Sequence, residues 1–219
     1  IQNIGRESYY GARRDTNAYG KTKDFTVVGG AQYSYDFDNF LFMPSSLTAG
    51  VEYSYNKLND LMLGYHREIN QEVSVYSAYL QNEWKTGRFS FLLGGRLDKN
   101  SEIDDPIFSP RLNIRYNPIP DLSLRASYSE GFRAPQTYDE DLHVAAVGGE
   151  VTLIQVAKDL KTERSRSYSA SVDYYTTWGP VQINLLLEGF YTSLHNPFVL
   201  EEIESDDENK ILERRNGSD

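Results

Sequence analysis

Apolar and polar residues alternate along much of the chain, and the pattern is clearest between positions 109 and 135. Apolar side chains at Leu112, Ile114 and Tyr116 alternate with polar ones, and the alternation resumes after a turn at 117–121. Because successive side chains of a strand point to opposite faces, this period of two predicts a β-hairpin with one apolar and one polar face. A soluble sheet would bury the apolar face in a core, whereas a membrane barrel would place it in lipid.

The same period recurs in other segments and predicts about eight antiparallel strands. Residues 1–24, 57–71, 98–108 and 130–162 lack it and are expected to form mainly loops. The phase of the alternation changes near Val75, which predicts a β-bulge there, because one extra residue in a strand shifts the phase. The expected strands are 25–37, 47–56, 72–84, 89–97, 111–116, 122–129, 168–174 and 181–191.

Short and long connections alternate between these strands. Tight turns are expected at 43–46, 85–88, 117–121 and 178–180, with longer connections between them. An up-and-down barrel of the outer membrane visits its two rims in turn, with short turns on the periplasmic rim and long loops outside. The Greek-key connections of a soluble sandwich mix lengths at both ends. The predicted fold is therefore all-β: an antiparallel up-and-down transmembrane β-barrel, present here in part.

The composition agrees with a barrel wall. The chain has 17 Tyr and 10 Phe, residues that favour strands and the interface between hydrocarbon and water. No apolar run approaches the about 20 residues of a membrane-spanning helix. The absence of Cys excludes disulfides and thiolate metal sites. A net charge of −10 argues against a nucleic-acid partner, whose phosphates the chain would repel.

The central hairpin and the residues after it carry a family resemblance. The segment Ser109–Asn113 (SPRLN), the strand 122–129 and the motif that follows resemble the barrel of a TonB-dependent outer-membrane receptor. The segment 160–163 resembles the approach to the next strand of such barrels, although Thr162 stands where Pro is usual. The motif itself consists of Gly131, Phe132, Arg133, Ala134 and Pro135.

The resemblance implies a barrel of about 22 strands, filled by an N-terminal plug domain, that imports a scarce nutrient too large for porins. A ferric siderophore, cobalamin or haem would be such a nutrient. The implied partners are this ligand, the lipid of the outer membrane and the TonB complex, which acts through the plug. We expect residues 1–219 to be a portion of such a barrel, without the plug, the energy-coupling box or the C-terminal strands.

The polar face of the predicted strands is expected to point into the barrel lumen, towards water or the plug. Arg133 is expected among these interior charges, paired with a carboxylate of the barrel or the plug. On a soluble sheet the same residues would form a solvated surface, and neither arrangement would make them catalytic. The expected lumen-facing set contains Arg96, Arg111, Asn113, Arg115 and Arg125, together with Glu52, Asp173 and Glu188.

Ligand contacts are expected in the long loops. None of the three histidines, His66, His143 and His195, has a partner at metal-ligand spacing, so the sequence indicates no metal or haem ligand. It also lacks a nucleophile elbow and a phosphate loop, which predicts no cofactor and no enzymatic activity. The side chains expected to contact the ligand are Tyr138, His143, Tyr191, His195 and Phe198.

Two other functions are compatible with the pattern. The first is a passive outer-membrane barrel, either a porin or the anchor of an adhesin, which a plug domain upstream in the gene would exclude. The second is a soluble, carbohydrate-binding β-sandwich, in which the tyrosine-rich face would form the core. A chain that remained monomeric without detergent would favour the sandwich, because an excised barrel wall exposes strand edges and a lipid face.

Overall fold

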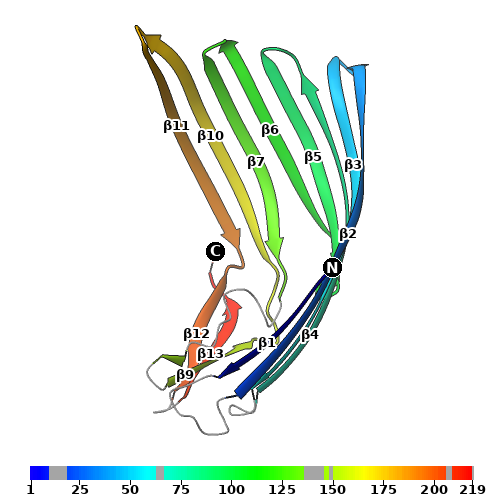
Figure 1. Ribbon diagram of the computed structural model, residues 1–219, viewed down its shortest axis with the longest axis vertical. Helices are drawn as coiled ribbons and strands as arrows, with labels where there is room; N and C mark the ends of the chain where they lie inside the picture. Colours follow the sequence, from blue (N-terminus) through cyan, green and yellow to red (C-terminus); the bar gives the residue numbers. More distant parts are fainter. Residues whose placement is uncertain (10–18, 63–66, 136–145, 148–149, 206–208, 219) are drawn as a thin grey trace.

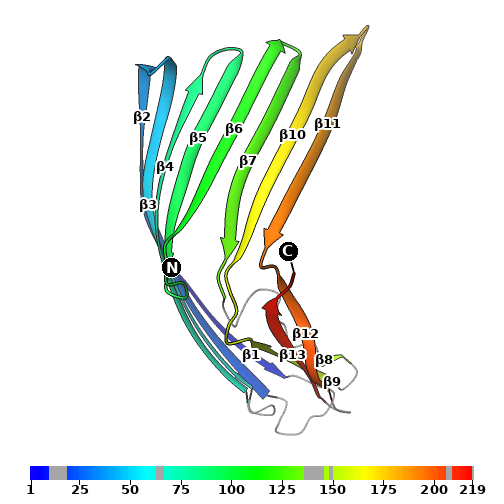
Figure 2. The ribbon, with the colours of Figure 1, turned by 180° about the vertical axis from the view of Figure 1, so that it is seen from behind.

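The computed structural model describes residues 1–9, 19–62, 67–135, 146–147, 150–205 and 209–218. These residues form two β-sheets (Figures 1 and 2). The larger sheet has nine strands in the order β1-β2-β3-β4-β5-β6-β7-β10-β11, and the smaller has four in the order β12-β13-β9-β8. The described part of the chain contains no helix long and apolar enough to cross a membrane.

All neighbours in the larger sheet are antiparallel, and each strand pairs with the next along the chain except where β7 pairs with β10. Its strands are β1 (Gln2–Tyr9), β2 (Tyr19–Phe40), β3 (Met43–Met62), β4 (Arg67–Lys85), β5 (Phe89–Asn100), β6 (Ile107–Ile119), β7 (Leu122–Arg133), β10 (Glu163–Trp178) and β11 (Val181–His195). This up-and-down order confirms the predicted fold.

The tight turns of the larger sheet lie together at one end. The connections at 41–42, 86–88, 120–121 and 179–180 are all at the top of Figure 1. The longer connections lie at the opposite end, so the predicted alternation between two rims is confirmed. At the last of the tight turns, Gly179 has a φ of 60°, a left-handed conformation that costs glycine little because it has no Cβ.

The exposure of the two faces is the opposite of that in a water-soluble sheet. Leu80, Leu93 and Leu187 are 56%, 50% and 74% exposed, whereas Ser77 and Asp98 on the other face are 7% and 4% exposed. We call the apolar, exposed face the outer face and the polar, shielded face the inner face. A sheet in water would cover its apolar side, so this arrangement fits a barrel wall with lipid outside and not a soluble sandwich.

Aromatic side chains form two belts on the outer face. Near the tight turns, Trp84 stacks with Phe42, with ring centroids 5.4 Å apart, and packs at 5.5 Å from Phe91. Towards the other rim, the rings of Tyr128 and Tyr168 lie 4.9 Å apart on neighbouring strands. Such belts mark the two membrane–water interfaces of outer-membrane barrels.

The separation of the belts matches a membrane. Tyr168 and Trp178 belong to the two belts on β10, and the strand between them rises about 33 Å at about 3.3 Å per residue. A tilt of about 40° reduces this rise to about 25 Å, the height of the apolar band in outer-membrane barrels. Strand segments beyond the tyrosine belt therefore lie outside the bilayer, on the side of the long connections.

Several expected loops are strand in the structure. Residues 1–24 contain β1 and the start of β2, and β3 and β4 occupy 57–71 apart from 63–66, which lies outside the described residues. The loop predictions for these segments are wrong. The alternation of apolar and polar residues did not reveal these strand segments because they extend past the membrane, where no lipid requires an apolar outer face.

Other boundaries also differ from the prediction. The first tight turn is at 41–42 and not at 43–46, because β3 already begins at Met43. Residues 98–100 continue β5. The segment 130–162 contains the end of β7 and two further strands, β8 (Ala146–Val147) and β9 (Glu150–Val156).

The predicted β-bulge near Val75 is also wrong, because β4 pairs with β3 and with β5 in unbroken register through this position. The apolar positions instead change face where the strands leave the membrane. Val73 on β4 and Leu58 on β3 lie on the inner face, where they are 8% and 2% exposed. Outward positions at this level carry charge, as in the pair Lys57–Glu72 at 3.5 Å. Beyond the membrane, water favours charged residues on the outer face and packing favours apolar residues on the inner face. The distribution of apolar and polar residues between the two faces is therefore reversed there.

The smaller sheet lies at the end of the long connections (Figure 1, bottom). It combines β9, from the connection between β7 and β10, with β12 (Phe198–Ser205) and β13 (Asn209–Asn216), which follow β11. β13 pairs in parallel with β9 and antiparallel with β12. Segments far apart in the sequence are thereby joined at the rim outside the membrane.

Candidate functional site

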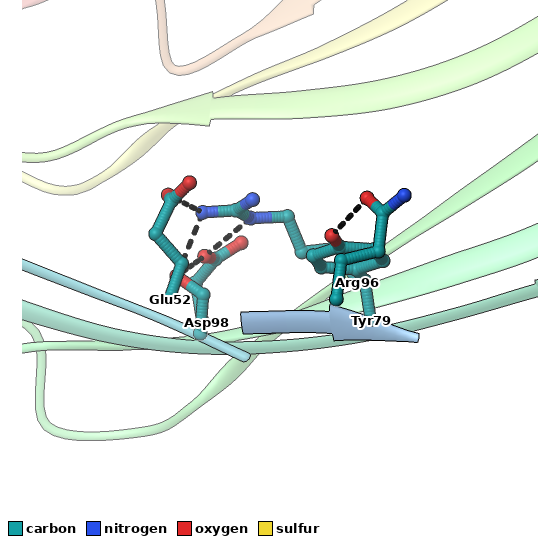
Figure 3. Close-up of polar contacts among 6 residues, drawn as sticks. Glu52, Tyr79, Arg96 and Asp98 are labelled. Carbon is teal, nitrogen blue, oxygen red and sulfur yellow. Dashed lines mark hydrogen bonds and ion pairs between the residues drawn. The ribbon is translucent and has the colours of Figure 1, made fainter. Parts of the chain in front are cut away.

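Arg96 on β5 connects three strands on the inner face (Figure 3). Its Nη2 donates hydrogen bonds to Glu52 Oε1 at 2.8 Å and to Ser77 Oγ at 2.7 Å, and its Nε donates to Asp98 Oδ1 at 2.8 Å. Ser77 Oγ also donates to Asp98 Oδ1 at 2.6 Å. Hydrogen bonds between ionised groups are the strong ones in proteins, so these contacts hold β3, β4 and β5 in register.

The same network accounts for the burial of a carboxylate. The Asp98 side chain is only 5% exposed, against 37% for Arg96 and 40% for Glu52. A shielded carboxylate is costly unless it is paired and hydrogen-bonded, and Asp98 satisfies both conditions. The one guanidinium meets two carboxylates, so the charge of Arg96 is fully compensated within the wall.

Tyr79 extends this polar surface towards β2. Its hydroxyl donates to Gln32 Oε1 at 2.7 Å, and its ring lies across Gly50 of the intervening strand. A Cβ on Gly50 would be 2.3 Å from Cζ of Tyr79, closer than side-chain atoms approach. Only glycine allows this ring to lie flat against the sheet and reach Gln32.

Three arginines occupy the inner face on the other side of this network. Arg111 and Arg115 lie on β6, Arg125 lies on β7, and Arg115 and Arg125 are directly opposite in the register. We call these three residues the arginine cluster. Arg125 reaches Asp173 of β10 at 3.8 Å, while Asn184 Nδ2 donates to the same carboxylate at 2.6 Å.

Two members of the arginine cluster, Arg111 and Arg115, lack the compensation that Arg96 has. Among the described residues, no carboxylate lies within 4.0 Å of the guanidinium of Arg111 or Arg115. The Nε of Arg115 is buried and has no hydrogen-bond partner in this part of the chain. Ser90, which pairs with Arg115 in the register, already donates its hydroxyl to Glu83 at 2.6 Å.

An open hollow of about 400 Å³ lies between the Arg96 network and the arginine cluster. It therefore presents charges of both signs to the lumen. The polar residues that line it are Glu52, Tyr79, Gln81, Arg96, Ser109, Arg111, Ser129 and Glu130.

At the rim outside the membrane, the structure brings together two residues that the sequence analysis singled out separately. The guanidinium of Arg133 lies 5.5 Å from the ring centre of Phe198, and that of Arg214 lies 5.9 Å from it. The backbone N–H of Phe198 donates to Glu163 Oε2 at 2.6 Å. Cations over an aromatic ring are attracted by its electron-rich face, so Phe198 joins the smaller sheet to the ends of β7 and β10.

Asn216 of β13 stabilises the same junction between the smaller sheet and the larger one. Its Oδ1 accepts from the backbone N–H of Lys161 at 2.8 Å, and its Nδ2 donates to the carbonyl oxygens of Lys161 at 3.0 Å and Asn196 at 2.9 Å. Asn196 itself has a φ of 52°, a left-handed conformation that asparagine tolerates better than most residues. One side chain therefore holds the connection before β10 and the turn after β11 against the smaller sheet.

Arg215 links β12 and β13 on the smaller sheet. It contacts Glu213 at 2.8 Å and Glu201 at 2.7 Å. The hydrogen bond to Glu213, followed by the charge of Glu201, raises the pKa of Arg215 above its ordinary value. This guanidinium therefore stays charged throughout the physiological range.

The residues expected to contact ligand are dispersed. Tyr138 and His143 lie outside the described residues, as does His66. Tyr191 is on the outer face, 65% exposed and 6.3 Å from the ring of Tyr168, and His195 lies in the same register row as Arg164 on that face. The ligand roles of all five residues stay predictions.

The family motif spans the end of a strand. β7 ends at Arg133, Ala134 is 7% exposed, and Pro135 follows outside the strand. Gly131 is opposite Ser165, whose Oγ would be 3.1 Å from a Cβ at this position. Phe132 lies opposite Arg164. Of the predicted lumen-facing set, Asn113 lies on the inner face opposite Ser127.

Some site residues escaped the sequence analysis. Ser77, Tyr79 and Asp98 are central to the inner face, but Asp98 falls in a segment expected to be a loop. Continued alternation through β5 was the available signal, since Asp98 has the same parity as Arg96. Arg214, only 4% exposed beneath Phe198, lies on a strand that no clear alternation indicates. Within the described ranges, no group of three His, Cys, Asp or Glu side chains could hold a metal ion.

Comparison with known families gives a match over nearly the whole chain. The family model described as TonB dependent receptor-like, beta-barrel, matches residues 2–207. Among curated proteins, the iron-regulated outer membrane virulence protein of Vibrio cholerae is 29% identical over 157 residues, which cover 69% of this chain and 22% of that protein.

Solved structures of similar fold include two siderophore receptors named PirA. The one from Pseudomonas aeruginosa has a TM-score of 0.68 at 17% identity and covers 91% of this chain and 38% of its own. The one from Acinetobacter baumannii has a TM-score of 0.66 at 18% identity and covers 98% of this chain and 36% of its own. The chain thus spans well under half the length of these relatives.

Proposed function

The chain belongs to the TonB-dependent receptor family, as part of a β-barrel in the outer membrane of a Gram-negative bacterium, and from this we propose that the protein containing it imports a scarce nutrient. The match over residues 2–207 carries the proposal. The exposed apolar outer face and the charged inner face support it, because a transport barrel needs lipid on one side of its wall and a polar path on the other.

We infer that the nutrient is a ferric siderophore. Two similar structures are siderophore receptors, and the curated relative is an iron-regulated outer membrane protein. Ferric complexes of this kind are commonly anionic, and the guanidiniums of Arg133 and Arg214 beside Phe198 would attract an anion at the rim outside the membrane. Cobalamin and haem, the other nutrients of this class, are alternative results of the test below.

In this proposal the rim outside the membrane captures the ligand. Two guanidiniums lie near the ring of Phe198 there, and Tyr138 and His143 stand in the sequence between β7 and β8. The wall described above then forms one side of the path inward. Energy would come from the TonB complex in the inner membrane, acting on a plug domain that lies outside residues 1–219.

Uptake measurements test this function. The full-length receptor is expressed in a strain that lacks its own siderophore receptors, and cells are supplied with ⁵⁵Fe-loaded siderophores, labelled cobalamin or haem. We expect uptake of one ferric siderophore that stops when the tonB gene is deleted. Uptake that persists without TonB would identify a passive barrel, and uptake of cobalamin or haem alone would replace the proposed substrate.

A further inference from the structure

The arginine cluster on β6 and β7 is only partly compensated. Arg125 pairs with Asp173, but no carboxylate of the described residues lies within 4.0 Å of the guanidinium of Arg111 or Arg115. The chain as a whole has a net charge of −10, so three neighbouring arginines are not the result of a basic composition. Glu52 and Asp98 neutralise Arg96 inside the wall, whereas Arg115 and Arg125 face each other across neighbouring strands. Like charges directly opposite on a sheet destabilise it.

Other polar groups near the tight turns of these strands are also incomplete. Besides Arg115 Nε, the buried Asn117 Oδ1 and Ser123 Oγ have no hydrogen-bond partner in the described part of the chain. Arg115 and Ser123 have the parity of the inner face, and Asn117 lies in the irregular stretch between Tyr116 and Ile119. Unpartnered buried polar groups are rare in native proteins and each needs an explanation. Three of them beside two opposed arginines indicate that a group supplied from the lumen completes this surface.

We propose that the arginine cluster binds an acidic segment of the receptor's own polypeptide, located inside the barrel, through Asp or Glu carboxylates that contact Arg115 and Arg125. Carboxylates match the charge and the forked geometry of guanidinium groups. The occupant is a permanent part of the protein and not the passing nutrient, because the repulsion between the arginines acts whether or not nutrient is present. The relatives have ample additional chain, since this wall covers at most 38% of their length in the two receptor structures compared.

This inference rests on the proposed function, because an interior segment is expected only in a plugged barrel. It adds where that segment attaches and with what charge. The acidic contact lies against β6 and β7, whereas Arg96 on β5 is already paired with Glu52 and Asp98 within the wall.

Zero-length cross-linking identifies the partner. Arg115→Lys and Arg125→Lys variants of the full-length receptor in detergent are treated with a water-soluble carbodiimide, which joins a lysine amine to a carboxylate in contact with it, with loss of water. Mass spectrometry then locates the new amide bond. We expect Lys at 115 or 125 to couple to an Asp or Glu outside residues 1–219. Arg96→Lys is the matched control, and it should couple to Glu52 or Asp98 within the wall.

A stability measurement decides the question independently of the coupling chemistry. Arg115→Met keeps most of the side-chain stem but removes the charge. With an acidic partner, the variant should lower the melting temperature of the full-length receptor by several degrees, because carboxylates would lose their counter-ion. Without a partner, relief of the repulsion with Arg125 should raise it. A higher or unchanged melting temperature, or coupling only to Asp173, would overturn the proposal.

Neither measurement needs nutrient or TonB. A receptor that fails to import siderophores but shows the cross-link would refute the proposed substrate and keep the acidic contact. A receptor that imports siderophores but forms no cross-link would support the proposed substrate and refute the acidic contact.

Discussion

The two halves of strands β3 and β4 follow opposite rules. Between the aromatic belts, apolar residues such as Leu80 point outward and are exposed, and the inner face carries Glu52, Ser77 and Tyr79. Beyond the tyrosine belt the order reverses, with Leu58 shielded on the inner face and charged residues outside. The backbone register is continuous through the change. A single strand can therefore extend from lipid into water, because the outer face of each half carries the kind of residue that its surroundings favour.

The largest expected effect is in the half beyond the membrane. Leu58→Asp would place a carboxylate at a site 2% exposed, opposite Asp24 and on the same face as Asp60. Burial of an unpaired charge should cost more than about 4 kcal/mol, measured by denaturant unfolding of the receptor in detergent. Leu61→Asp, on the outward side of the same strand, should cost under about 1 kcal/mol. If the two variants lost equal free energy of unfolding, the reversed arrangement of apolar and charged faces beyond the membrane would be refuted.

An intermediate effect is expected at the middle of the membrane half. Leu80 lies midway along β4 between Tyr76 and Trp84, which belong to the two aromatic belts. Leu80→Arg should destabilise the receptor by about 2–4 kcal/mol, because the charge would enter hydrocarbon.

Its neighbour provides the control. Gln81→Arg, one residue further along and on the inner face beside the hollow, should change the free energy of unfolding by less than about 1 kcal/mol. Refolding into lipid vesicles at graded denaturant concentrations compares the two variants. If Gln81→Arg were the more damaging substitution, the assignment of lipid and lumen faces would be inverted.

The smallest expected effect concerns packing on the inner face. Gly50→Ala would force the Tyr79 ring to rotate away and lose its hydrogen bond to Gln32, at a cost of about 1–2 kcal/mol. Gly29→Ala is the control, since no other atom lies within 4 Å of its Cβ position. Thermal unfolding should show a loss for Gly50→Ala alone, and that loss should largely disappear when Tyr79 is replaced by Ala in both backgrounds.

The sequence alone predicted the elements that depend on lipid. Between the belts each strand has an apolar outer face, so the alternation of segments such as 47–56 and 122–129 was clear. Three tight turns were predicted where the structure has them, at 86–88, 120–121 and 179–180, although residues 117–119 of the second predicted turn belong to β6. The motif at 131–135 added the family resemblance, which the comparison over residues 2–207 confirmed. The loops predicted at 1–24 and 57–71 were wrong for the complementary reason, since strands outside the membrane need no apolar outer face.

A period of two assigns a residue to a face, and this much the sequence determined for Glu52, Arg96 and Arg125. It does not determine which residues meet across that face, because the pairing of strands depends on turns and register along the whole sheet. Only the tertiary structure decided that Arg96 meets Glu52, 44 positions away, and that Arg115 faces Arg125. The physical difference is one of range: the lipid acts on each residue separately, whereas charge compensation depends on neighbours that the folded sheet brings together.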